Sequence, residues 1–205
     1  MDGIIIAIGI LVFSIILHEI THGLVALWFG DDTAKIAGRL TLNPIPHIDL
    51  FGSIILPLIL IFTGSPVLLA WAKPVPINIW KLRGNKLGMT CVALAGIATN
   101  LLLALMAGLI IRLAGLTFGS IFGNILAFVI LINLVLAVFN LIPIPPLDGS
   151  RILMMWLSDE QAMKLERMSF FFIILIFILI PYLPIWPIVT WLASLIVGAN
   201  FLSPF

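Results

Sequence analysis

Charged side chains are scarce in this chain of 205 residues, which has 10 lysines and arginines and 9 aspartates and glutamates. They form 9% of the chain, against about 25% in an average soluble domain. The net charge of +1 gives no basic field for nucleic acid, so no nucleic-acid partner is expected. The single cysteine, Cys91, excludes an internal disulfide. These scarcities exclude a soluble domain and indicate an integral membrane protein in contact with lipid.

Hydrophobic residues, in contrast, make up 62% of the chain, and the mean hydropathy is +1.29. A helix needs roughly 20 residues to cross a bilayer, and five apolar stretches approach or exceed that length: 3–29, 51–72, 89–114, 119–142 and 168–197. We predict an all-α membrane protein with a bundle of about four to six transmembrane or re-entrant helices. A short irregular or β segment is expected after the first helix, where Gly, Asn and Pro are frequent.

The chain leaves no room for a sizeable soluble module, so residues 1–205 are predicted to form a single membrane-embedded domain. Its core is expected over 3–153 and further helices over 154–205. The last apolar stretch contains three prolines and is predicted to be interrupted rather than one straight helix.

The sequence His18-Glu19-Ile20-Thr21-His22 ends the first long apolar run. Two histidines four residues apart lie about 40° apart around a helix, so both imidazoles can reach one metal ion. The glutamate between them is the usual general base of a zinc hydrolase. A charged or metal-binding side chain within a membrane is costly and indicates a functional site. We therefore predict His18 and His22 as metal ligands and Glu19 as the catalytic base.

A catalytic zinc ion usually has three protein ligands and one open position for water, so a third ligand is needed. Asp148 follows a proline-rich segment and is the only acidic residue between Asp49 and Asp159. The prolines end the preceding helix and leave the carboxylate free to turn toward a cavity. Two alternatives stay open: Asp148 belongs to an ordinary Asp-Gly turn, or His47 is the third ligand.

Two motifs together resemble a known family. HEITHG at residues 18–23 and NLIPIPPLDG at residues 140–149 look like the motifs of the site-2 proteases. These are the intramembrane zinc metalloproteases of peptidase family M50, and the resemblance runs from His18 to about residue 153. It implies one zinc ion held by His18, His22 and Asp148, with Glu19 as general base. It also implies that Asn140 helps to hold the substrate or the developing oxyanion.

The resemblance extends to residues 95–100, Ala-Gly-Ile-Ala-Thr-Asn, which are similar to the family's glycine and small-polar motif. Many members have Gly-Pro where this chain has Gly-Ile. We predict Asn100, Asn43 and His47 as substrate-binding residues. The segment 37–44 could pair with an unwound substrate by edge addition. No PDZ or CBS module is seen, so the chain resembles a minimal member of the family.

The ligands must lie at one depth in the membrane, and this constrains the topology. The HExxH motif and Asp148 both come at the C-terminal ends of apolar runs, so those two helices must run in the same direction. An odd number of crossings then separates them, and one of the stretches 51–72 and 89–114 does not cross. We predict that 51–72 is re-entrant, because Pro57 and Gly64-Ser65-Pro66 break it.

The loop 73–86 has four basic residues and no acid, so the positive-inside rule predicts that it is cytoplasmic. A re-entrant 51–72 then places the HExxH end on the cytoplasmic side as well. Four crossings are expected, over 3–29, 89–114, 119–142 and 168–188. The predicted location is a prokaryotic plasma membrane, with the active site toward the cytoplasm.

The motifs indicate an intramembrane zinc metalloendopeptidase of the EC 3.4.24 class. We expect its substrate to be a membrane protein that is cut in or near a transmembrane segment. A membrane metal transporter or channel would also explain His18, His22 and Asp148. It gives no reason for Glu19 to lie between the two histidines. The sequence does not identify the substrate or the oligomeric state.

Overall fold

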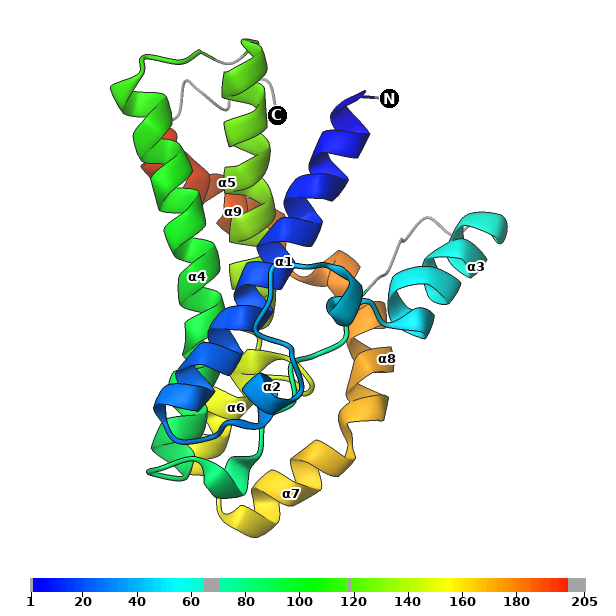
Figure 1. Ribbon diagram of the computed structural model, residues 1–205. Coiled ribbons are helices and arrows are strands. Elements are labelled where there is room, and N and C mark those ends of the chain that lie inside the picture. The colour runs from blue at the N-terminus through cyan, green and yellow to red at the C-terminus, as the bar shows by residue number, and fades with distance from the viewer. Residues whose placement is uncertain (1, 65–70, 118, 199–205) are drawn as a thin grey trace.

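The computed structural model describes residues 2–64, 71–117 and 119–198, and these residues form helices, turns and irregular segments without a strand (Figure 1). Three of the described helices are long and apolar enough to cross a membrane: α1 (Asp2–Trp28), α4 (Lys86–Leu113) and α5 (Ile121–Asn140). The all-α prediction is confirmed. The segment after α1 is irregular rather than β.

The remaining elements are short. They are α2 (Thr33–Ile36), η1 (Ile45–His47), the π-helix η2 (Leu50–Ile55), α3 (Leu56–Phe62), η3 (Ile79–Lys81), α6 (Asp148–Leu153), η4 (Met154–Trp156), α7 (Asp159–Arg167), α8 (Ser169–Leu179), η5 (Ile180–Tyr182) and α9 (Ile185–Val197).

Helices α1 and α5 run in the same direction, and α4 runs in the opposite direction (Figure 1). Helix α4 packs against both α1 and α5. The predicted parallel direction of the two ligand-bearing segments is therefore confirmed. The basic loop also lies beside the end of α1, because the Arg83 N–H donates to the Phe29 carbonyl at 2.8 Å.

The largest buried cluster lies where α4, α5 and α9 meet. Ile130 and Leu134 of α5 and Val189 of α9 have at most 1% of their surface exposed. Ala104 and Ala107 of α4 lie in the same cluster. Small residues let transmembrane helices approach closely, so α4 and α5 form a fixed pair against which α1 rests.

The stretch 51–72 contains less helix than its apolar length suggests. The π-helix η2 continues into α3, which ends at Phe62 and lies apart from α1, α4 and α5 (Figure 1). Pro57 does not break this segment. It lies in the first turn of α3, where proline is tolerated. Ser65 and Pro66 lie outside the described residues, so the re-entrant path stays a prediction.

The stretch 168–197 is interrupted, as predicted. Helix α8 has 11 residues and is followed by the single turn η5 and then by α9. Eleven residues of α-helix span about 16 Å, roughly half of the hydrocarbon core. A turn at Ile180–Tyr182 divides the stretch 168–188, and the expected fourth crossing there stays a prediction.

Candidate metal centre

Three side chains from two elements meet in the interior. The Nε2 atoms of His18 and His22, on one face of α1, are 2.9 Å apart. Each lies 3.1 Å from Oδ2 of Asp148, the first residue of α6. All three side chains are buried. The structure thus brings together the three residues that were predicted as metal ligands, and His47 is not a member of the group.

A sharp return of the chain after α5 places Asp148. Helix α5 ends at Asn140, and the turns of residues 141–147 lead into α6. A Cβ atom on Gly149 would collide with the backbone carbonyls of Leu141 and Ile142, so this close return requires glycine at 149. Asp148 therefore begins a new helix. The prolines were expected to end the preceding helix, and the structure shows turns at residues 141–147 before Asp148.

Each histidine has its other ring nitrogen committed to an acceptor. Nδ1 of His22 lies 2.7 Å from the Val92 carbonyl oxygen, which can only accept, so Nδ1 carries a proton. Nδ1 of His18 lies 2.6 Å from Oδ1 of Asn100 and likewise donates. In a neutral imidazole this leaves a lone pair on Nε2. Both lone pairs are thus available on the side where Asp148 lies.

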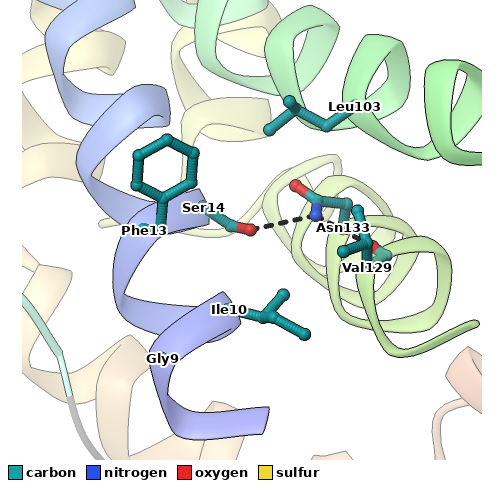
Figure 2. Close-up of a pocket in the computed structure, with 7 residues that line it drawn as sticks. All are labelled: Gly9, Ile10, Phe13, Ser14, Leu103, Val129 and Asn133. Carbon is teal, nitrogen blue, oxygen red and sulfur yellow. Dashed lines mark hydrogen bonds between the residues drawn. The ribbon is translucent and has the colours of Figure 1, made fainter. Parts of the chain in front are cut away.

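A chain of hydrogen bonds fixes the orientation of the Asn100 amide. Asn133 Nδ2 donates to the Val129 carbonyl and to Ser14 Oγ, both at 2.9 Å (Figure 2). Its Oδ1 accepts from Asn100 Nδ2 at 2.9 Å, which turns the Asn100 oxygen toward His18. Neither asparagine has exposed surface. Asn133 of α5 therefore orients the Asn100 amide, and the Asn100 amide fixes the proton of His18 on Nδ1.

A cavity of about 290 Å³ opens beside this chain of bonds, between α1, α4 and α5. Ser14 and Asn133 are its polar lining residues, and Figure 2 shows their hydrogen bond at its wall. The other lining residues are Gly9, Ile10, Phe13, Leu103 and Val129. The cavity is therefore apolar except at the point where the hydrogen-bond chain begins.

The donor set fits a metal ion. Ligands of one tetrahedral zinc ion, at about 2.0–2.1 Å, lie roughly 3.3 Å from one another. The three separations of 2.9, 3.1 and 3.1 Å are close to that value. The buried Oδ2 of Asp148 has no hydrogen-bond donor, and it faces two nitrogen lone pairs. A cation removes the repulsion between such groups, and two imidazoles with one carboxylate are ligands that suit zinc.

Gly96 of α4 leaves the space that the imidazoles occupy. A Cβ atom there would lie 2.5 Å from His22 Nε2 and 2.6 Å from His18 Cε1. Glycine at this position therefore lets α4 approach the ligands directly, consistent with the close-packing role of small residues in membranes.

Glu19 lies beside the ligand group and is partly exposed. Its Oε2 accepts a hydrogen bond of 2.7 Å from the backbone N–H of Val75. Val75 belongs to a segment without helix or strand that follows Trp71. Sequence reasoning predicted the glutamate but not this partner, because a backbone N–H leaves no mark in the sequence.

The other predicted site residues do not join the ligand group. Asn140 Nδ2 donates to the Leu136 carbonyl of its own helix at 2.9 Å. Asn43 is exposed and accepts from the Ile45 N–H. His47 is buried, with Nε2 2.9 Å from the Thr41 carbonyl. The roles of these three residues in binding substrate stay predictions, and Asn100 lies buried behind His18.

The sequence did not predict all of the groups that surround the two histidines. Val92 contributes a carbonyl, which any residue could supply. Ser14 is a polar residue in an apolar run, and it lies four residues before His18 on the same helix face. That spacing was the one available signal for Ser14.

Comparisons with known proteins identify the family of this chain. The model of "Peptidase family M50" matches residues 114–181. "Putative zinc metalloprotease YwhC" of Bacillus subtilis is 40% identical over 150 residues, which are 70% of this chain and 65% of that protein. "Putative zinc metalloprotease Rip2" of Mycobacterium tuberculosis is 32% identical over 186 residues, 89% of this chain and 70% of that protein. The chain belongs to peptidase family M50.

A second Rip2, of Mycolicibacterium smegmatis, is 32% identical over 181 residues, which are 84% of this M50 chain and 66% of that protein. The chain thus spans slightly less than two thirds of YwhC and of this Rip2. No solved structure matches the chain. The M50 relatives carry the name of zinc metalloproteases, and this M50 chain has a buried His-His-Asp group that could bind a metal ion.

Proposed function

We propose that this protein is an intramembrane zinc metalloendopeptidase that hydrolyses a peptide bond in or near a transmembrane segment of a membrane protein. The observation that carries the proposal is that His18, His22 and Asp148 meet beside Glu19. The two histidines and Glu19 lie on α1, which is apolar enough to span a membrane. Membership of family M50 supports the same activity.

The proposed roles follow from the geometry. His18, His22 and Asp148 would hold the ion through two Nε2 atoms and Oδ2. A bound zinc ion supplies an acidified water and polarises the scissile carbonyl. Glu19 takes the proton of the attacking water and passes it to the leaving amine. The amides and carbonyls behind the histidines hold both rings in the tautomer that ligation requires.

Substrate contacts are proposed for residues near the centre. Asn140 is half-buried at the end of α5, and its side chain would have to leave the Leu136 carbonyl to donate to a substrate carbonyl. Residues 37–44 contain turns rather than a strand, so pairing with an unwound substrate would require this segment to extend.

The proposed orientation places the end of α1 and the basic loop on the cytoplasmic side of a prokaryotic plasma membrane. The contact between Arg83 and Phe29 supports their common side. Cysteine labelling in a Cys91→Ser background tests it. Lys35→Cys and Arg83→Cys should react with a membrane-impermeant reagent from the cytoplasmic side, and Thr117→Cys from the opposite side. Reaction of residues 35 and 83 from different sides would contradict the proposal.

The decisive experiment uses the purified chain in proteoliposomes with a single-span model substrate tagged at both ends. Glu19→Gln should keep one bound zinc ion per chain and lose cleavage, because the amide cannot accept the proton. His18→Ala should lose both zinc and cleavage. Unchanged cleavage by Glu19→Gln would remove the proposed base.

The same vesicles separate the protease from a metal transporter. Zinc flux into vesicles without substrate, equal for the wild type and Glu19→Gln, would favour transport. Substrate cleavage without zinc flux is the expected result. A matched control is Glu160→Gln, which changes an exposed glutamate on α7 far from the ligand group in sequence and should leave cleavage unchanged.

A further inference from the structure

The segment Lys73–Asn78, called the strap below, contains neither helix nor strand and contacts the HExxH end of α1 at Glu19 and Gly23. Four hydrogen bonds hold it. The Lys73 N–H donates to the His47 carbonyl at 2.9 Å, and the Lys73 carbonyl accepts from Arg39 Nη2 at 2.6 Å. The Val75 N–H donates to Glu19 at 2.7 Å, and the Asn78 N–H donates to Asp31 at 2.6 Å. The strap is thus fixed at both ends and at its middle.

The two prolines of the strap leave its middle with a single donor. Pro74 and Pro76 have no N–H, so Val75 carries the only backbone donor of this tripeptide. That donor is used on Glu19. Proline also disfavours the helical conformation for the residue before it. Lys73 and Val75 are therefore restrained to an extended backbone without a neighbouring strand.

Val75 touches α1 at two points. Its side chain is 5% exposed and lies over Gly23, where an added Cβ would be 3.2 Å from Val75 Cγ1. Its N–H meets Glu19, one helical turn earlier on the same helix. A side-chain contact and a backbone hydrogen bond together define where the strap lies along α1.

Arg39 holds the strap at the carbonyl of Lys73. The guanidinium is buried, with 6% of the residue exposed, and it donates to the Lys73 carbonyl. A buried charge is costly unless polar partners receive it. This arrangement therefore holds Lys73, two residues before Val75, against movement away from α1.

We propose that the strap positions the general base: the Val75 N–H holds Oε2 of Glu19, so that Oε1 is presented to the attacking water. Val75 is then a positioning residue, and Arg39 supports it through Lys73. The inference rests on the proposed protease function and adds a determinant of its rate. A hydrogen bond to a carboxylate is stronger than one between neutral groups, and a misplacement of about 1 Å in an active site can cost on the order of 100-fold in rate.

The test is Val75→Pro in the full chain, assayed with the model substrate in proteoliposomes. This substitution deletes the N–H and keeps an extended backbone. We expect kcat to fall about tenfold or more, with KM and the zinc content unchanged. The matched control is Ile77→Pro, because the Ile77 N–H makes no hydrogen bond within the described residues. It should keep kcat within about twofold.

A second variant covers the case in which Val75→Pro does not fold. Arg39→Met keeps every strap N–H but releases the Lys73 carbonyl, and kcat should fall severalfold at constant zinc content. An unchanged or increased kcat in the folded variants would overturn the proposal, and an increase would indicate an inhibitory latch. Cleavage by the wild type, lost in Glu19→Gln, tests the protease function separately.

Discussion

The two halves of α1 are both apolar, yet their surroundings differ completely. In the first half, Ile4 and Ile5 have 67% and 69% of their surface exposed. From Ser14 onward, every fourth residue is buried, and together they form one stripe: Ser14, His18, His22 and Ala26. In a helix that is apolar all round, the contact face is therefore marked by small and polar residues at four-residue spacing, not by hydrophobicity.

The strongest test of this stripe is Gly96→Ala on the facing helix. The new methyl group would lie 2.5–2.6 Å from atoms of both imidazoles, so the rings must move apart. Zinc affinity should fall on the order of 100-fold, as expected when ligand orientation is lost. Competition with a chelator measures it. Leu105→Ala, at an exposed position of the same helix, is the control, and full zinc retention in Gly96→Ala would refute the steric argument.

Removing the support behind the stripe should have the next largest effect. Asn100→Ala takes away the acceptor of His18 Nδ1, and zinc affinity should fall about 10- to 100-fold. Asn133→Ala acts one amide further away, so it should lower zinc affinity by less. Asn124→Ala removes an asparagine of α5 that binds the Gly119 N–H instead. Equal zinc affinities in all three variants would show that the amide chain does not orient the ring.

A pair of identical substitutions compares the halves of α1 directly. In Gly23→Ala, the new Cβ would lie 2.5 Å from Leu40 Cδ2 and 3.1 Å from Ala34 Cβ. Overpacking of this kind costs about 1–3 kcal/mol. In Gly9→Ala, no atom lies within 4 Å of the new Cβ, so stability should change by no more than about 1 kcal/mol. Thermal unfolding in detergent measures both, and equal shifts would contradict the contrast between the halves.

The smallest effect is expected beyond the end of α1, where Lys81 Nζ lies 2.7 Å from Asp32 Oδ1. This hydrogen bond lowers the pKa of Asp32 and raises the pKa of Lys81. The contribution of the pair is therefore complete above the unfolded pKa of aspartate and below that of lysine. It is lost as the pH falls through the folded pKa of Asp32 or rises through that of Lys81.

Because both side chains are exposed, Lys81→Met should lower the Tm by at most about 2 °C near pH 7. The difference from the wild type should vanish in acid, where Asp32 is neutral. A difference that persists at pH 2 would mean that packing of the lysine stem, rather than charge, is responsible.

The sequence predicted the parts of the structure that depend on local pattern. The apolar lengths predicted α1, α4 and α5, and the HExxH spacing predicted that the two histidines share a face. The requirement of one depth predicted that α1 and α5 are parallel. Asp148 was predicted near the histidines because a third ligand was needed and because its motif resembles that of the family, and the structure shows the three together.

What the sequence did not predict depends on contacts between distant segments. The Val92 carbonyl and the Val75 N–H are backbone groups, which every neighbouring residue also carries. The prolines predicted the interruption of 168–197, but they did not predict that α9 would pack against α5 and α4. The position of Asn100 behind His18 follows from helix rotation, which an all-round apolar helix does not reveal.

The ligands and the groups that support them are far apart in the sequence, and this separation sets an order of assembly. Helix α1 is synthesised first, but its histidines find their partners in Val92, Asn100 and finally Asp148. A nascent chain that ends before residue 148 therefore carries two imidazoles in an apolar helix without their carboxylate. The group that could hold a metal ion is therefore complete only after residue 148 has been synthesised.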